Sequence, residues 1–366
     1  MSEPTTTETT VPESRLSPAQ WEIARRAAFV VYAALVAVQL TAGIPPLDPG
    51  LPVSPIILLG WFGLASAIWS LGRDRRELVY ALIGWGSLAV AIRLYSATRG
   101  VVDNWWGSPV PVPGHPSTIP EQAITNARWV LSIDRVIGFG NNPSQWLQRH
   151  LYLSGNDRGA RWEVVTALTY MSHYFVVYVV AIVQWLRDRR EWLRWVLTLS
   201  TMMLLGVILY MLVPTAPPWL AAPMALVGPV NRVGTRSLHY LHLNFADRLW
   251  KKGAASTNEV AAFPSLHFGF TVMVSMYFWK RARPWVKGVL VSYPLLMGFT
   301  LVYSGEHYVF DCLAGALLAY VVVWFNRRYV SQWFPKLLGP TQLSDGNVTS
   351  PFADEPSPQA KPTLST

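Results

Sequence analysis

The sequence predicts an all-α integral membrane protein, folded as a polytopic bundle of about eight transmembrane helices. Three observations support this fold class. First, 51% of the 366 residues are hydrophobic and only 14% are charged, whereas soluble chains carry about a quarter charged residues. Second, the apolar residues gather in runs of about 20, the length that crosses a bilayer. Third, clusters of Arg and Lys fall in alternate loops, as the positive-inside rule requires.

Eight apolar runs are the candidate membrane spans. They cover residues 27–44, 54–71, 78–95, 163–186, 192–213, 263–279, 285–303 and 308–325. Basic clusters precede the first span, follow the eighth, and separate the second from the third, the fourth from the fifth and the sixth from the seventh. Both chain termini are therefore expected on the cytoplasmic side of the plasma membrane.

The other segments complete the predicted domain organisation. Residues 1–26 and 338–366 are polar and are expected to form disordered cytoplasmic tails. Residues 27–95 hold the first three spans, 96–162 form a long extracytoplasmic loop, and 163–328 hold the catalytic membrane core. An uncleaved first span is favoured over a signal peptide, because the polar leader is long and no clear small-residue cleavage site follows the apolar run.

The loop 96–162 is predicted to contain two short helices that lie at the membrane interface. In the segment NPSQWLQRHLYL, Asn142 suits the N-cap and Pro143 the first helical position. One face of this helix would present Trp146, Leu147, His150 and Leu151. Such a face is typical of an interfacial helix.

The net charge of +9 does not indicate nucleic-acid binding. Membrane proteins collect Lys and Arg in cytoplasmic loops, and the sequence carries no RNA- or DNA-binding motif. The single cysteine, Cys312, lies in an apolar run. An internal disulfide and a cysteine metal site are therefore both excluded.

Two short segments carry the candidate chemistry, FPSLH at 263–267 and SGEHYVFD at 304–311. Asp311 follows His307 by four residues, which places both on one face of a helix. A carboxylate beside an imidazole fixes its tautomer and stabilises its cation. Because His267 opens the sixth span and His307 the eighth, both are expected on the outer side of the membrane.

Two histidines and one carboxylate at a membrane boundary suit phosphoryl transfer from a lipid phosphate or diphosphate. Neutral His307 would attack phosphorus to give a phosphohistidine, while Asp311 holds the other ring nitrogen. His267 would protonate the leaving oxygen and then activate water or a polyol hydroxyl. Ser265 and the N–H groups at the start of the sixth helix would bind the anion. This scheme requires no metal and no other cofactor.

Each of these residues also has an ordinary structural explanation. A carboxylate at mid-bilayer costs about 2.5–3.5 kcal/mol, so Asp311 needs a partner even near the membrane edge, and His307 supplies one. His173 either supports the site or, as we favour, makes a hydrogen bond between helices. Ser304 is a candidate supporting residue, and Glu306 is either another or a solvated surface group. Ordinary interfacial residues are the favoured interpretation for His115, His150, His239 and His242.

The two segments resemble the second and third signature motifs of the type 2 phosphatidic acid phosphatase superfamily, in the correct order and spacing. PTAPPWL at 214–220 and IDRVIGFGNNPSQWLQRHLY at 133–152 resemble the branch that contains fungal inositol phosphorylceramide synthases and their bacterial relatives. The resemblance covers roughly residues 130–325. It implies a six-helix catalytic core and metal-independent chemistry.

The resemblance also implies residue roles: His307 as nucleophile, Asp311 as its orienting partner, His267 as acid and base, and Ser265 as a phosphate contact. Two cations of the superfamily pattern are absent. The first motif, Lys followed by Arg-Pro, is not visible, and Leu301 occupies a position where the third motif commonly has arginine. The inositol-transferring branch resembles this chain in both absences. Four cations of the second outer loop are candidate replacements: Arg232, Arg236, Lys251 and Lys252.

The sequence therefore predicts a lipid phosphatase or phosphotransferase that acts on a membrane lipid, with water or a polyol as acceptor. The resemblance favours transfer of an inositol-phosphate-type headgroup. Two alternatives stay open. One is a non-catalytic lipid transporter or scaffold with the same fold. The other is a metal-dependent hydrolase that uses His267, His307 and Asp311 as ligands.

Overall fold

The computed structural model describes six stretches of the chain: residues 16–44, 55–73, 75–116, 118–153, 159–243 and 258–330. The chain divides into two compact units, Met1–Leu82 and Ile83–Thr366. The predicted C-terminal tail and the first 15 residues lie outside the described residues. Both signature segments belong to the second unit.

The first unit consists of α1 (Pro18–Thr41), α2 (Pro55–Ser70) and the first part of α3 (Arg75–Trp105). α1 begins before residue 27, where the sequence predicted a disordered tail. Ser17 Oγ accepts a hydrogen bond from Gln20 N at 3.3 Å, and Gln20 Oε1 accepts one from Ser17 N at 2.7 Å. This capping box, with proline at the first helical position, explains the early start.

The second unit is mostly helical. Its membrane-length helices are α6 (Glu163–Arg187), α7 (Arg189–Leu212), α11 (Pro284–Tyr303) and α12 (Val309–Phe325). Its shorter helices are α4 (Glu121–Ile137), α5 (Pro143–Leu151), α8 (Pro218–Ala221), η1 (Arg236–Leu241), α10 (Leu266–Phe278), η2 (Trp279–Arg281) and the π-helical η3 (Asn326–Val330). Strands β1 (Pro109–Pro111) and β2 (Thr118–Pro120) form an antiparallel pair.

Within the described residues, six helices are long and apolar enough to cross a membrane: α1, α3, α6, α7, α11 and α12. The shorter apolar helices α2 and α10 coincide with the two remaining spans of the eight predicted. The predicted fold class is confirmed, and the protein is an integral membrane protein. One boundary is wrong, because α3 continues to Trp105 instead of ending near residue 95.

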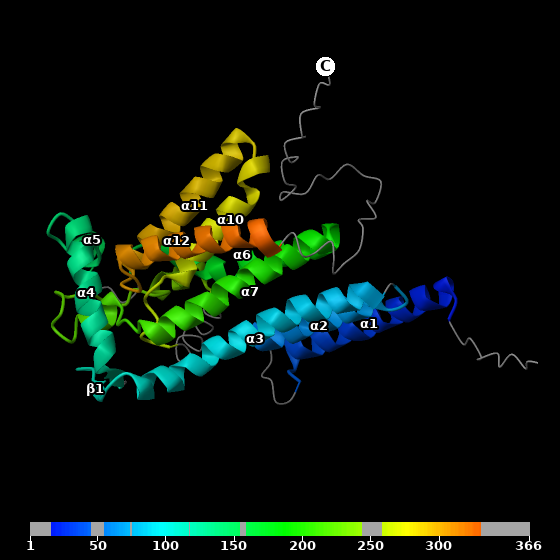
Figure 1. Ribbon diagram of the computed structural model, residues 1–366, viewed down its shortest axis with the longest axis horizontal. Helices are drawn as coiled ribbons and strands as arrows, with labels where there is room; N and C mark the ends of the chain where they lie inside the picture. The colour runs from blue at the N-terminus through cyan, green and yellow to red at the C-terminus, as the bar shows by residue number, and fades with distance from the viewer. Residues whose placement is uncertain are drawn as a thin grey trace, which may run out of the picture. The chain divides into compact units, whose positions relative to one another are not determined.

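Figure 1 shows α4 and α5 lying across one end of the bundle formed by α6, α7, α10, α11 and α12. α4 packs against α12, and α5 packs against α11. As predicted, Asn142 Oδ1 caps α5 by accepting from Gln145 N at 2.9 Å. This end of the bundle carries both signature segments.

Two glycines let the helices with the signature histidines approach closely. A Cβ at Gly315 of α12 would lie 2.1 Å from the carbonyl oxygen of Ser265, just before α10. A Cβ at Gly269 of α10 would lie 2.8 Å from the carbonyl oxygen of Gly315. Small residues at such crossings allow backbones of membrane helices to touch. The contact brings the start of α10 against the start of α12.

Candidate active site

The two signature histidines meet at this end of the bundle. His267 lies in the first turn of α10, and His307 lies two residues before the start of α12. His267 Nδ1 lies 3.2 Å from His307 Nε2, which is within hydrogen-bond distance. His307 is only 3% exposed. The structure therefore brings together the pair of rings that the sequence placed on the same side.

The other nitrogen of His307 is held by a backbone carbonyl. Nδ1 lies 2.8 Å from the oxygen of Ala262, and because a carbonyl only accepts, Nδ1 carries the proton. Nε2 then presents its lone pair toward His267. The predicted partner Asp311 lies near, with Oδ2 3.5 Å from Nδ1, but Ala262 takes the closer position.

Asp311 is fully buried at the start of α12. Its Oδ2 accepts a hydrogen bond from Tyr308 N at 2.9 Å, which fixes the turn that carries His307. Its Oδ1 is buried with no hydrogen-bond partner among the described residues. The carboxylate therefore both shapes the backbone next to His307 and places negative charge beside the ring.

His267 packs against two aromatic rings of α6. The ring centroid of His173 lies 4.2 Å from that of His267, edge to face, and the centroid of Tyr170 lies 5.3 Å away. His173 Nδ1 bonds the carbonyl oxygen of Tyr170 on its own helix. Within the described residues this bond lies inside α6 and not between helices, as we favoured, and the His173 ring packs edge to face against His267, where a supporting residue would lie.

Ser265 caps α10 and joins it to α12. Its Oγ accepts from Phe268 N at 3.3 Å, and its own N–H donates to the carbonyl oxygen of Asp311 at 2.9 Å. The side chain is fully buried. The structure thus gives Ser265 a capping role, and its contact with phosphate stays a prediction.

Arg232 is the described candidate cation that lies beside the histidine pair. Its Nε donates to Glu306 Oε1 at 2.7 Å and its Nη2 to Glu306 Oε2 at 3.2 Å, a two-pronged ion pair next to His307. The guanidinium stacks over the ring of Trp219 at 4.4 Å. Burial opposes the charge of Arg232, but Glu306 more than offsets this and raises its pKa. Glu306 is only 9% exposed, so the interpretation as a solvated surface group is wrong.

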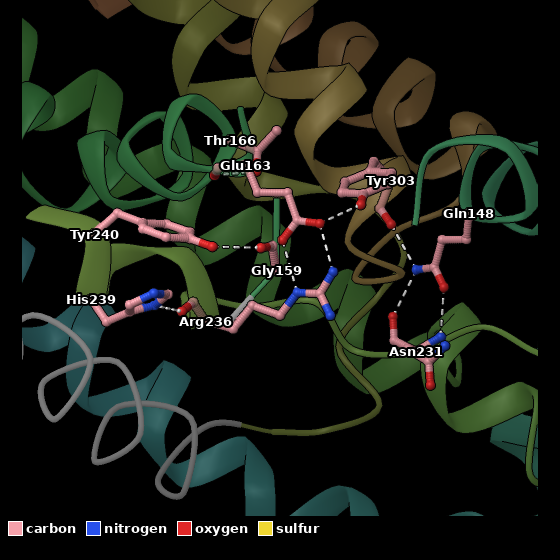
Figure 2. Close-up of polar contacts among 9 residues, drawn as sticks. All are labelled: Gln148, Gly159, Glu163, Thr166, Asn231, Arg236, His239, Tyr240 and Tyr303. Atoms are coloured by element: carbon pink, nitrogen blue, oxygen red, sulfur yellow. Dashed lines mark hydrogen bonds and ion pairs between the residues drawn. The ribbon is translucent and has the colours of Figure 1, made fainter. Parts of the chain in front are cut away.

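Arg236 makes a similar pair elsewhere. Its Nη2 donates to Glu163 Oε1 at 2.6 Å and its Nε to Glu163 Oε2 at 2.8 Å. Figure 2 shows this pair with the hydroxyl of Tyr303, which donates to Glu163 Oε1 at 2.8 Å. Arg236 therefore joins η1 to α6 and is bound to a structural carboxylate. Lys251 and Lys252 lie outside the described residues.

Gln148 of α5, which the sequence analysis missed, braces the loop that carries Arg232. Its Nε2 donates to the carbonyl oxygens of Asn231 and Tyr303, both at 2.7 Å, and its Oε1 accepts from Asn231 N at 2.7 Å (Figure 2). Ser304 assists through its backbone, because its carbonyl oxygen accepts from Val233 N at 3.2 Å. A signal was present, since Gln148 is a polar residue on the face of α5 opposite Trp146.

Asp134 of α4 was also missed. Its Oδ2 accepts from Val309 N at 3.2 Å and its Oδ1 from Phe310 N at 2.9 Å, so it caps α12 from another helix. The side chain is fully buried. Burial raises the pKa of Asp134 to about 6, with a smaller contribution from Asp311, while the two N–H donors act in the opposite direction. The available signal was a lone carboxylate on the apolar face of an amphipathic helix.

The four histidines interpreted as ordinary residues lie outside the pair. His150 Nδ1 bonds the carbonyl oxygen of Trp146 at 2.8 Å, and His239 Nδ1 bonds that of Arg236 at 2.7 Å. His115 packs its ring against Trp219. His242 ends η1 in a left-handed conformation. Among the described residues, no group of three or more His, Cys, Asp or Glu side chains is arranged as a metal site.

Comparison with known families agrees with this geometry. The sequence model of the PAP2 superfamily matches residues 128–325, more than half of the 366-residue chain. The chain belongs to the PAP2 superfamily. The match contains the second part of α4, all of α5, both signature segments and all of α12, so the resemblance predicted from the motifs is confirmed.

Curated relatives carry names from the expected branch. The chain is 30% identical over 138 residues to the inositol phosphorylceramide synthase catalytic subunit of Saccharomyces cerevisiae, which covers 34% of this chain and 32% of that protein. It is 29% identical over 136 residues to the phosphoinositol dihydroceramide synthase of Bacteroides thetaiotaomicron, covering 35% and 43%. It is 30% identical over 139 residues to the inositol phosphorylceramide synthase of Candida albicans, covering 34% and 27%. The match thus spans less than half the length of these relatives, and no solved structure is significantly similar.

Proposed function

We propose that this protein is a membrane lipid phosphatase or phosphotransferase that forms a phosphohistidine on His307. The observation that carries the proposal is the 3.2 Å contact between His267 Nδ1 and His307 Nε2. Because Ala262 holds the proton on Nδ1 of His307, its Nε2 is the nucleophilic atom. Membership of the PAP2 superfamily supports this assignment.

In the first half of the reaction, Nε2 of His307 attacks phosphorus, a P–N bond forms and the bond to the leaving oxygen breaks. His267, in its protonated form, gives the leaving oxygen a proton. In the free protein the two histidines contact each other. When substrate binds, His307 instead contacts phosphorus and His267 contacts the leaving oxygen. The positive charge that develops on His307 is stabilised by the carbonyl of Ala262 and by Asp311, 3.5 Å away.

In the second half, neutral His267 takes a proton from water or from a polyol hydroxyl. The resulting nucleophile attacks phosphorus, the P–N bond breaks, and His307 returns to its neutral form. Water gives a phosphatase and a polyol or another alcohol gives a phosphotransferase. The chemistry needs no metal, because Arg232 and the N–H groups at the start of α10 provide positive charge.

Arg232 is the proposed phosphate-binding cation. Glu306 accepts two hydrogen bonds from its guanidinium and directly precedes His307 in sequence, so the pair is held close to the nucleophile. Preorganised positive charge at a phosphoryl group is worth most where burial excludes water. Arg236 is a weaker candidate, because its partner Glu163 begins α6, whereas the partner of Arg232 directly precedes His307.

Asp134 is the proposed positioning residue. Its carboxylate holds the N–H groups of Val309 and Phe310, so it fixes the start of the helix that follows His307. A carboxylate at this end also complements the helix dipole of α12. Asp134 therefore acts on the nucleophile through α12 and not through contact with substrate.

The proposed substrate is a membrane lipid with a phosphate, diphosphate or phosphodiester group, and the proposed transfer is of an inositol-phosphate-type headgroup. The names of the Saccharomyces cerevisiae and Bacteroides thetaiotaomicron relatives support this class. The alternating basic clusters support an extracytoplasmic site with both termini in the cytoplasm.

Purified protein incubated with a panel of labelled lipid phosphates and diphosphates, with and without inositol and other polyols, tests this function. Free phosphate identifies a phosphatase, and a new phosphodiester identifies a transferase. Turnover should persist in the presence of a chelator and should disappear in His307→Ala. Absence of turnover with every lipid, or full activity of His307→Ala, would contradict the proposal and favour a lipid transporter or scaffold.

A further inference from the structure

A cavity of about 340 Å³ lies where α4 ends and α5 begins. We call this region, residues 135–149, the elbow. Arg135, Asn142, Trp146 and Arg149 are among the residues that line the cavity. Its volume is within the range of small-ligand pockets. It shares no residue with the histidine site.

The lining of the cavity is positively charged. Arg135 and Arg149 line it, and no carboxylate does. Neither guanidinium makes an ion pair with any residue in the described part of the chain, in contrast to Arg232 and Arg236. Arginine binds phosphate oxygens with two parallel hydrogen bonds. The charge therefore points to an anionic ligand, and phosphate matches it best.

A buried side chain with an unpaired donor also lines the cavity. Asn142 is 5% exposed, and its Oδ1 is used to cap α5 by accepting from Gln145 N. Its Nδ2 is buried without a partner among the described residues. Leaving such a donor unpaired costs about 1–3 kcal/mol, so a ligand that accepts from it is favoured. The positive end of the α5 dipole adds to the attraction for an anion.

The elbow is shaped by its own backbone. Gly138 N donates to the carbonyl of Asp134 at 2.8 Å, Gly140 N to that of Arg135 at 2.7 Å, and Asn141 N to that of Gly138 at 3.0 Å. Gly140 has φ 91°, which favours glycine. The turn beside the cavity is therefore held in place by its own backbone hydrogen bonds.

Apolar side chains at the tip of the turn identify the kind of ligand. Phe139 is 96% exposed and Val136 is 77% exposed, although both lie next to the cationic cavity. Binding of a soluble phosphate would not explain two exposed apolar side chains at this position. In an integral membrane protein, apolar residues beside cations are typical of contact with a lipid layer, where the cations bind headgroups.

We propose that the elbow is a docking site for the phosphate of an anionic lipid headgroup, with Phe139 and Val136 in the acyl layer. Arg135 and Arg149 bind the phosphate oxygens, Asn142 donates an additional hydrogen bond, and the indole of Trp146 lines the cavity. The site goes beyond the proposed phosphohistidine chemistry and does not depend on it. It holds an anionic lipid beside the reaction centre, because α4 and α5 also carry Asp134 and Gln148.

Binding of dihexanoyl phosphatidic acid to full-length, detergent-purified protein tests the site. The His307→Ala background prevents turnover during the measurement. Replacing both cations, Arg135→Gln with Arg149→Gln, should raise Kd by about tenfold or more. The matched control, Arg128→Gln with Arg161→Gln, removes the same charge from exposed arginines outside the cavity and should change Kd less than about twofold. Equal Kd values for the two double variants would overturn the proposal.

Two further probes identify the ligand class. Dihexanoyl phosphatidylcholine should bind more weakly than phosphatidic acid, since it has no net negative charge. Phe139→Ser should weaken binding of the lipid and leave binding of inorganic phosphate unchanged. If inorganic phosphate binds as tightly as the lipid and Phe139→Ser has no effect, the lipid assignment is wrong. Lipid turnover by the Arg135→Gln, Arg149→Gln variant, measured with His307 intact, reports on the phosphohistidine chemistry separately from lipid binding at the elbow. A failure of one proposal can therefore be told from a failure of the other.

Discussion

Two arginines four positions apart, Arg232 and Arg236, form ion pairs of nearly the same geometry but lie in different surroundings. Each guanidinium donates two hydrogen bonds to one glutamate, and each stacks on an aromatic ring. Glu306, the partner of Arg232, directly precedes His307. Glu163, the partner of Arg236, begins α6 and also accepts from Tyr303. Ion-pair geometry by itself therefore does not identify a catalytic cation.

The partners explain the difference. Glu163 is 1% exposed and joins three elements, α6, η1 and the end of α11, so its pair is part of the packing. Glu306 joins a loop to the turn that presents the nucleophile. A buried ion pair stabilises little compared with an apolar replacement, so the pair next to the reactive ring has the stronger functional explanation.

The largest effect expected within this comparison is that of Arg232→Gln. Removing one preorganised donor from a transition state typically costs about 10²–10³ in turnover, and we expect a loss of kcat/KM in that range with the protein still folded. Steady-state kinetics on the best lipid of the panel provide the measurement. If Arg236→Gln lost as much activity per folded molecule as Arg232→Gln, the assignment of Arg232 to phosphate binding and of Arg236 to a structural role would be wrong.

A smaller effect is expected for Asp134→Asn. The amide of asparagine has one oxygen, so it can accept from Val309 N or Phe310 N at only one of the two carboxylate positions. The start of α12 is then held less firmly, and His307 is less well oriented. We expect kcat to fall about tenfold with KM nearly unchanged. Asp134→Ala should lose more, while a purely structural role would lower the amount of folded protein and leave kcat per folded molecule intact.

The same variant has a defined pH signature. Because the pKa of Asp134 in the folded protein is about 6, above its ordinary value of 3.8, the folded state keeps this proton to higher pH than the unfolded state does. The stability from this group is therefore greatest below pH 3.8 and falls as pH rises toward and through 6. Relative to Asp134→Asn, wild type should lose thermal stability across this window. Asp311, Tyr308 and Cys312 are the other titratable groups that interact electrostatically with Asp134 among the described residues. Parallel unfolding curves of the two proteins would refute the assigned pKa.

The smallest effect on turnover is expected for Arg236→Gln. Breaking a buried pair leaves Glu163 uncompensated, which typically costs about 3–5 kcal/mol. Part of this is screened, since the Arg236 side chain is 15% exposed. Thermal unfolding should show a clear loss of stability, while kcat per folded molecule should stay within about twofold of wild type. A second variant, Arg236→Lys, keeps the charge and should recover part of the stability. A variant that is fully stable but inactive would assign Arg236 to substrate binding.

Much of the fold followed from the sequence, because apolar runs and basic clusters reflect the physics of the bilayer directly. All eight predicted spans correspond to helices. The errors lie at helix ends, where local chemistry decides. Ser17 and Gln20 start α1 early through a capping box. α3 continues past Gly100 as far as Trp105 and ends just before Gly107, which has φ 92°.

The site was predictable only where its residues are close in sequence or belong to a motif. His307 and Asp311 are four residues apart, although His307 lies just before α12 and not on the helix face that was predicted, and the FPSLH motif supplied His267. Ala262 was not predictable, since a backbone carbonyl has no sequence signature. Asp134 stood out only as a lone carboxylate on the apolar face of α4, and its role depends on a tertiary contact with α12. Glu306 was misjudged because its burial depends on Arg232, 74 residues earlier.

Rapid quenching of the protein during turnover of a lipid labelled at the reacting phosphorus tests the central proposal most directly. We expect a protein-bound label that is stable in alkali, labile in acid and located on the peptide that contains His307. The label should be absent from His307→Ala and retained in Arg236→Gln. Product formation without any such label, or a label on another residue, would contradict the phosphohistidine mechanism.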